Sequence, residues 1–214
     1  MKIVAFFSAL FLSVALLLTA LYSVAVGTDT YEYHQVRLRV AERSLFSEEE
    51  LSLLNCEVAG YLKGENELSG ANFSERERMH MVDVRNLVFL CRRVMCVSWA
   101  LSAIGILTVC LREKWNASIL LLRGAWQALG AMAGAILLIA AVCAVDFTWA
   151  FTLFHKILFT NDLWLLSASS TLIRMFPEDF FRAMAGSIGL RFAGMLLLAL
   201  SVGKGLKYYA DTRC

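Results

Sequence analysis

The 214-residue chain is predicted to be an all-α integral membrane protein, and three features of its sequence indicate this fold class. Hydrophobic residues make up 59% of the chain and charged residues 18%, with a mean hydropathy of +0.63. A soluble domain has about 45–50% apolar and about 25% charged residues. Four long apolar runs alternate with polar segments. We therefore expect four transmembrane helices, with two partly helical extracytoplasmic segments that form a cap at the outer membrane face.

The predicted spans cover about residues 3–26, 94–111, 124–145 and 183–203. The first run is longer than the core of a signal peptide, about 7–15 residues, so we interpret it as a retained transmembrane helix. The third contains Gly130 and Gly134, small residues that we expect to pack against another span of the same chain. Because no repeat or flexible linker interrupts the sequence, a single membrane domain of residues 1–214 is expected.

The distribution of charge predicts the orientation. Residues 27–86 carry 12 acidic and 7 basic side chains, and residues 146–182 form the second long polar segment. Positive charge on cytoplasmic segments is the general rule for membrane proteins. Both termini are therefore expected in the cytoplasm of a cell-membrane protein, with both long polar segments outside. The residues behind this prediction are Lys2, Arg112, Lys114, Arg123, Lys204, Lys207 and Arg213, opposed only by Glu113 and Asp211.

The first outer segment contains clear helix signals. Ser47–Glu50 matches a capping box, and the helix that it begins is expected to end at Lys63, before Gly64. Ser74–Glu77 matches a second capping box, whose helix should continue directly into the second span. Residues 35–40 alternate between apolar and polar, which predicts a short strand.

The second outer segment, residues 146–182, is too charged to cross a bilayer but aromatic and aliphatic enough to lie along one. Pro177 fits the first turn of a helix, and Glu178 and Asp179 suit its positive end. Its aromatic residues are interpreted most simply as an interfacial belt, or alternatively as walls of an acyl-chain groove. These residues are Trp149, Trp164, Phe180 and Phe181.

Two histidines are the strongest candidates for chemistry. His80 has Asp83 three residues later on the predicted helix, close enough to hold its ring and tautomer. His155 is followed by Asn161 and Asp162. Because imidazole titrates near neutrality, two histidines at one membrane face can act as general base and general acid. The alternative is that each is a solvated interfacial residue. His34 is interpreted as structural.

Two arginines near the ends of spans are further candidates. Arg191 falls about 12 Å into the fourth span at about 1.5 Å per residue, where an arginine costs at least a few kcal/mol unless it is paired or hydrated. Arg92 lies where the second span enters the outer leaflet. It either serves the site or extends to lipid headgroups.

Several function classes are disfavoured. The net charge of +2 gives no footprint for nucleic acid. The sequence has no G-x-S-x-G elbow, phosphate-binding loop or metal-ligand spacing, so neither a cofactor nor a metal is expected. Cys56 is the only cysteine placed outside the membrane, which argues against an internal disulfide.

The motif around the second histidine resembles the bacterial lipoprotein intramolecular transacylase family. His80 before Asp83-Val84, and the layout of four spans with two outer segments, resemble the same family. The residues that carry the main resemblance are Phe154-His155, Phe159, Asn161-Asp162, Trp164-Leu165-Leu166, Leu172-Ile173 and Phe176-Pro177-Glu178-x-Phe180-Phe181.

This resemblance implies an acyltransferase that acts on diacylglyceryl-modified lipoproteins. The sn-2 acyl chain would move to the amino group of the N-terminal cysteine and leave a lyso-form lipoprotein. His155 and His80 would be the catalytic pair, with either of them as the base. Substrate-binding or positioning roles are expected for Asp83, Asn161, Asp162, Trp164, Arg92 and Arg191. Lipoprotein and membrane lipid are the expected partners of a monomer.

Two other functions stay open at this stage. A non-enzymatic lipid- or partner-binding membrane protein would use the acidic helix of the first outer segment. An interfacial lipid ester hydrolase would release fatty acid. The three functions differ in their products, because acyl migration keeps the total acyl content, hydrolysis lowers it, and binding alters no lipid.

Overall fold

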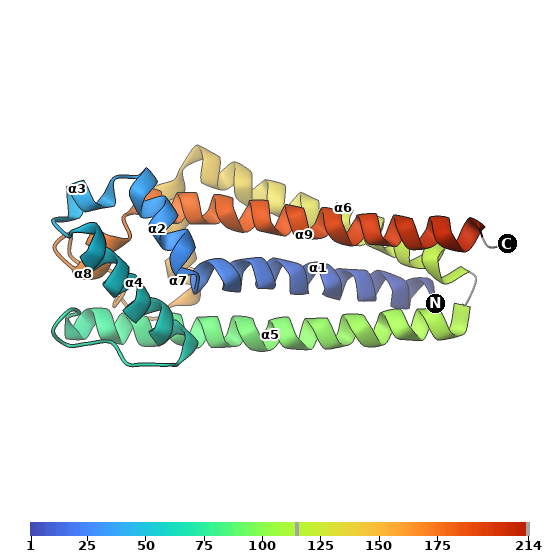
Figure 1. The fold of residues 1–214 in the computed structure, drawn as a ribbon, viewed down its shortest axis with the longest axis horizontal. Helices are drawn as coiled ribbons and strands as arrows, with labels where there is room; N and C mark the ends of the chain where they lie inside the picture. The colour runs from blue at the N-terminus through green and yellow to red at the C-terminus, as the bar shows by residue number, and fades with distance from the viewer. Residues whose placement is uncertain (114–115, 213–214) are drawn as a thin grey trace. The chain divides into compact units, whose positions relative to one another are not determined.

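The computed structural model describes residues 1–113 and 116–212, and every regular element in these residues is a helix (Figure 1). Lys114, Arg213 and Cys214 therefore lie outside the described residues. The helices are α1 (Lys2–Ala25), α2 (Thr28–Arg37), α3 (Val40–Ser44), α4 (Glu48–Lys63), α5 (Glu75–Glu113), α6 (Ala117–Val145), α7 (Phe147–Leu158), α8 (Thr171–Met175) and α9 (Glu178–Thr212).

Four helices, α1, α5, α6 and α9, are long and apolar enough to cross a membrane. They coincide with the four predicted spans. α5 has 39 residues, about twice the number that a bilayer requires, because it begins in the polar segment that precedes the predicted second span and continues into that span. The expected continuous helix from Ser74 into the second span is thus confirmed.

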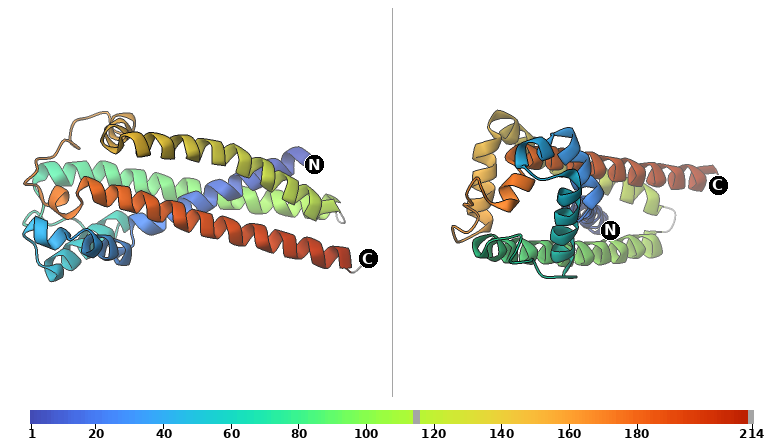
Figure 2. Two further views of the ribbon diagram at one scale, coloured as in Figure 1. Left: turned by 90° about the horizontal axis from the view of Figure 1, so that it is seen from above. Right: turned by 60° about the vertical axis from the view of Figure 1, so that its left-hand side comes forward.

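Residue contacts divide the chain into two compact units. The first unit contains residues 1–20, 91–141 and 189–214. Its helices pack through small residues: a Cβ added at Gly124 would meet the carbonyl oxygen of Ala5 at 2.6 Å, and one at Gly105 would meet the Ser8 hydroxyl at 2.0 Å. Within this unit, the N-terminal end of α1 and the C-terminal end of α9 lie at the same end (Figures 1 and 2).

The predicted packing of Gly130 and Gly134 against another span is not found. Within the described residues, no atom lies within 4 Å of a Cβ added at either position. α6 makes its close approach nearer its N-terminal end instead, where Gly124 lies against Ala5.

The second unit contains residues 21–90 and 142–188 and has its own hydrophobic core. α4 contributes a face of buried leucine and valine side chains, as its apolar spacing dictates. The predicted capping box is present: the Ser47 hydroxyl accepts from the Glu50 N–H at 3.1 Å, and the Glu50 carboxylate accepts from the Ser47 N–H at 2.7 Å. The helix ends before Gly64, whose φ of 84° suits glycine.

Residues 35–40 do not form the predicted strand. They belong to α2, to a turn and to the start of α3. The first pair of the alternating pattern is inverted in the structure, because Gln35 is 3% exposed whereas Val36 is 62% exposed. The Gln35 amide donates to Asn55 and to the carbonyl of Met175, each at 3.1 Å, and these bonds explain its burial.

One of the four aromatic residues assigned to the interfacial belt is buried in the core. Trp149 and Phe181 are exposed, but Phe180 is 2% exposed and packs in the core. Its ring lies 4.9 Å from Phe176 and 6.0 Å from Tyr31, measured between centroids. Assigning Phe180 to a belt was therefore wrong, because the first turn of α9 turns this side chain inward.

Candidate active site

The two candidate histidines lie next to each other in the second unit. His80 comes from the second turn of α5, and His155 from the last turn of α7. Their ring centroids are 6.3 Å apart, and the residues are 9% and 8% exposed. Neither histidine is solvated at a surface, so the alternative of two independent surface residues does not describe this structure.

One hydrogen bond defines the tautomer of His155. Its Nδ1 lies 2.7 Å from the carbonyl oxygen of Phe151, one turn earlier on α7. A carbonyl can only accept, so Nδ1 carries the proton in the neutral ring and Nε2 has the lone pair. In the described part of the chain, no other group hydrogen-bonds to this ring. The hydrogen bond therefore leaves Nε2 of the neutral ring as a potential proton acceptor.

Aromatic rings surround His155. The nearest is Phe151, at 4.3 Å between centroids, followed by Trp164 at 5.0 Å. Phe154 and Phe159 lie at 5.4 and 5.6 Å, and Phe159 also contacts His80 at 5.3 Å. We call these four residues, Phe151, Phe154, Phe159 and Trp164, the aromatic cage.

Burial keeps both histidines neutral near pH 7. Desolvation lowers the pKa of His155, although the hydrogen bond from its Nδ1 to Phe151 acts in the opposite direction. The pKa of His80 falls from 6.5 to about 4, mainly through burial and further through the neighbouring His155, while Asp83 opposes the shift.

Asp83 does not hold the ring of His80 as expected. Its carboxylate instead accepts a hydrogen bond from the Asn161 amide at 2.9 Å. The Nδ1 atom of His80 is buried and has no hydrogen-bond partner among the described residues. A buried polar atom without a partner requires an explanation, such as a bound ligand group.

Two hydrogen bonds connect the loop after α7 to α5. Asn161 binds Asp83, and the Arg76 guanidinium donates to the carbonyl oxygen of Asp162. Arg76, His80 and Asp83 follow each other at i, i+4 and i+7, so they share one face of α5. Sequence analysis missed Arg76, although this spacing was visible.

A cavity of about 380 Å³ adjoins the aromatic cage. Phe159 and Trp164 belong to both, so the cavity lies beside His155. It is lined by Thr152, Lys156, Phe159, Thr160, Asn161, Asp162, Trp164 and Leu165.

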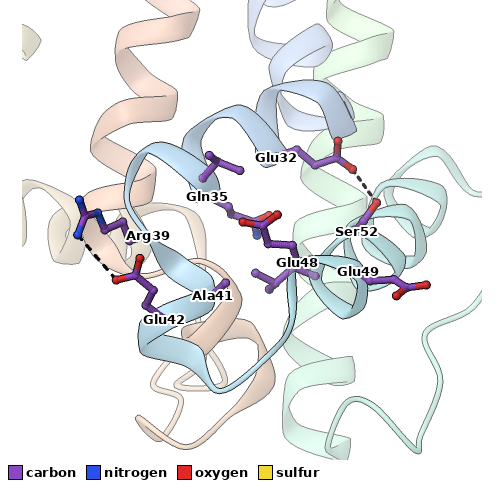
Figure 3. Close-up of a pocket in the computed structure, with 10 residues that line it drawn as sticks. Glu32, Gln35, Arg39, Ala41, Glu42, Glu48, Glu49 and Ser52 are labelled. Carbon is purple, nitrogen blue, oxygen red and sulfur yellow. Dashed lines mark hydrogen bonds and ion pairs between the residues drawn. The ribbon is translucent and has the colours of Figure 1, made fainter.

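A second cavity, of about 360 Å³, lies at α2, α3 and α4 (Figure 3). It is lined by four carboxylates, and none of the predicted site residues reaches it. Arg39 pairs with Glu42 at 3.9 Å, and Ser52 donates to Glu32 at 2.8 Å.

A model of one protein family, described as lipoprotein intramolecular transacylase Lit, matches residues 6–181. The chain belongs to this family. The predicted family is thus confirmed, and so is the predicted transacylase activity. The match covers both histidines and all helices that form the aromatic cage.

Solved structures of a lipoprotein intramolecular transacylase agree with the fold. An in meso structure of the membrane integral enzyme from Bacillus cereus is 25% identical, with a TM-score of 0.80 over 99% of this chain and 94% of that one. A histidine-to-arginine variant and a histidine-to-alanine variant of that enzyme are 24% identical, with TM-scores of 0.77 and 0.74. They cover 100% and 99% of this chain, and 93% and 94% of theirs. No curated protein matches.

The present transacylase is thus a multi-pass integral membrane acyltransferase with an all-helical fold. Arg92 and Arg191 belong to its first unit, on α5 and α9, whereas the other predicted site residues belong to the second. Within residues 1–113 and 116–212, no three histidine, cysteine, aspartate or glutamate side chains gather as metal ligands would.

Proposed function

We propose that this transacylase moves the sn-2 acyl chain of a diacylglyceryl lipoprotein to the amino group of its N-terminal cysteine, with His155 and His80 as the catalytic pair. The observation that carries this proposal is the orientation of His155. Its Nδ1 is committed to the Phe151 carbonyl, which leaves Nε2 as a proton acceptor beside a second buried histidine.

The reaction needs no nucleophile from the protein, because the amine and the ester belong to the same substrate. The neutral amine attacks the carbonyl carbon of the sn-2 ester, and a C–N bond forms. The nitrogen of the tetrahedral intermediate is then positively charged and acidic, and His155 Nε2 removes its proton. The C–O bond to the glyceryl group breaks, and the glyceryl oxygen receives a proton from the imidazolium of His155. The protein contributes mainly orientation and proton transfer.

His80 is assigned to the oxyanion. A pKa of about 4 makes it neutral at pH 7, so it is a poor proton source. A neutral imidazole still has one N–H, which can donate to the negative oxygen of the intermediate in a site with little water. Its buried Nδ1, without a partner among the described residues, supports the interpretation that a substrate group completes this bond.

Four residues position the pair and the substrate. Asp83 and Asn161 fasten the loop after α7 to α5, and Trp164 packs on His155. Asp162 lines the adjoining cavity. Its carboxylate would attract the ammonium form of the substrate before it loses a proton.

We propose that residues 27–86 and 146–182 lie at the extracytoplasmic face and form the cap of a single membrane domain of residues 1–214. The acidic excess of residues 27–86 supports this orientation, with cytoplasmic termini and a monomeric enzyme. Arg92 and Arg191 would bind the polar groups of lipid or substrate at the membrane interface.

The test replaces His155 by glutamine and by alanine. Conversion of a diacylglyceryl reporter lipoprotein should fall by a factor of about 10²–10⁴, the usual contribution of a general base, because the reactive nitrogen is lost. The matched control is His34→Gln, which removes a buried histidine that hydrogen-bonds Ser187 at 2.7 Å outside the pair. Near-normal turnover of membrane-inserted His155→Gln would contradict the assignment.

A further inference from the structure

The cavity beside the aromatic cage contains polar groups that the fold itself does not use. Among the described residues, no hydrogen bond or ion pair is found for the side chains of Thr152, Lys156, Thr160 and Asp162, all of which line it. By contrast, Asn161 in the same lining binds both Asp83 and the N–H of Leu163. Four unused polar groups around one cavity are available to a ligand.

The chemistry of this lining distinguishes between the parts of the proposed substrate. An acyl chain requires apolar walls, because displacing water from an ammonium and a carboxylate without pairing them is costly. A peptide brings its own amide donors and acceptors, which threonine hydroxyls, a lysine and a carboxylate can satisfy. The volume of about 380 Å³ lies within the range of small-ligand clefts.

Resting on the proposed function, we infer that this cavity is a peptide subsite. It holds the residues that follow the acylated cysteine of the lipoprotein, while the cysteine amine lies at His155. Phe159 and Trp164 form the shared wall, since each contacts His155 and also lines the cavity. The peptide is thereby directed away from the acyl chains.

Lys156 and Asp162 determine which charges this subsite accepts. Lys156 lies on α7 next to His155, and both charged residues are exposed and line the cavity. Reversing the charge of Lys156 must favour cationic peptide tails over acidic ones, whatever the preference of the unaltered enzyme. A change of two charge units near a protein surface corresponds to about a tenfold change in relative affinity.

The experiment measures binding of two synthetic probes to the enzyme in uncharged detergent. Both are diacylglyceryl cysteinyl peptides, one continuing Ser-Glu-Glu and the other Ser-Lys-Lys. Binding is measured in the His155→Ala background, so that no acyl transfer occurs. Lys156→Glu should shift the ratio of the two Kd values about tenfold toward the lysine tail. Asp162→Asn, a second variant, should shift it about threefold the other way.

The matched control is Lys63→Glu, which makes the same charge change at the end of α4, outside the cavity lining. It should leave the ratio unchanged. The subsite is overturned if Lys156→Glu and Asp162→Asn leave the ratio unaltered, or if Lys63→Glu changes it equally. If the expected shifts are found but the enzyme that retains His155 forms no N-acyl product, the subsite stands and the proposed function is refuted.

Discussion

At the scale of single residues, the proposed chemistry depends on shielding an imidazole from water. The aromatic cage surrounds His155, and burial lowers the pKa of this ring, which has no carboxylate partner among the described residues. In many enzymes an acidic residue orients the catalytic histidine. Here the Phe151 carbonyl accepts from Nδ1 of His155, which fixes the tautomer without adding a charge.

This arrangement predicts an unusual pH profile. Burial lowers the pKa of both histidines, that of His80 to about 4. The substrate amine, with a pKa of about 8, gains its proton at a higher pH than either histidine and then stops being nucleophilic. The logarithm of kcat/KM should therefore rise with a slope of one from pH 6.5 to 7.5 and level off above about 8.

Steady-state assays in buffers of constant ionic strength check this profile. A slope approaching two between pH 7 and 6.5 would show a second group titrating with the amine. That outcome would contradict a pKa of His155 below its ordinary value.

The catalytic candidates could be predicted from the sequence, but their partners could not. A histidine flanked by aromatic residues near a span is conspicuous, and Phe151 and Phe159 lie at i−4 and i+4 from His155. By contrast, the expected pairing of His80 with Asp83 was wrong. A helical i+3 spacing makes a contact feasible, but Asn161 from a distant loop occupies that carboxylate.

At the scale of elements, α5 positions the site, because one of its faces carries His80 between Arg76 and Asp83, and both of these residues bind the loop after α7. Arg76 and Asp83 hold the loop whose Trp164 packs on His155. We expect Asn161→Ala combined with Arg76→Gln to lower kcat by at least tenfold, since the ring positions would no longer be fixed.

Single-turnover rates separate this effect from substrate binding. The decrease should appear in kcat more than in KM, and the pH profile should acquire a histidine inflection as water enters the cage. Arg78→Gln is a control on the same helix, where the side chain is exposed. Full activity in the double variant would contradict the anchoring role.

A buried acid connects α5 to α8. Glu77 is 2% exposed and accepts from the Ser74 N–H at 2.8 Å, from its hydroxyl at 2.7 Å and from the Leu172 N–H at 2.8 Å. Glu77→Gln turns one acceptor oxygen into a donor, and should destabilise the enzyme by about 1–3 kcal/mol. Thermal unfolding in detergent measures this loss of stability. The control Glu75→Gln, in the same helical turn but exposed, should have little effect, and equal losses would contradict the role of Glu77.

The elements that follow local rules could be predicted. The two capping boxes and the glycine stop after α4 depend only on neighbouring residues, and all three are present. The strand predicted at residues 35–40 is absent because a tertiary interaction outweighed the local pattern. Gln35 is buried, and its side-chain amide exchanges two hydrogen bonds with that of Asn55. No local pattern contains that information, and no local pattern predicts the hydrogen bond from the Leu172 N–H to Glu77.

At the scale of the whole molecule, hydropathy predicted the number of membrane-crossing helices because the requirement for apolar length is strict. The division into two compact units was not visible, since α1, α5, α6 and α9 each contribute residues to both of them. The histidine pair, its anchors and the proposed peptide subsite all lie in the second unit, so one unit contains the whole site proposed for catalysis.

The second unit is proposed to transfer an acyl chain within one lipoprotein molecule. The most direct measurement is a fragmentation mass spectrum of the N-terminal peptide of a reporter lipoprotein. The enzyme is expressed in a bacterium that lacks other N-acylating enzymes. We expect an unchanged parent mass, with fragments of N-acyl cysteine and monoacylglyceryl. A parent mass lowered by one acyl chain, or an unmodified diacylglyceryl cysteine beside membrane-inserted enzyme, would contradict the account.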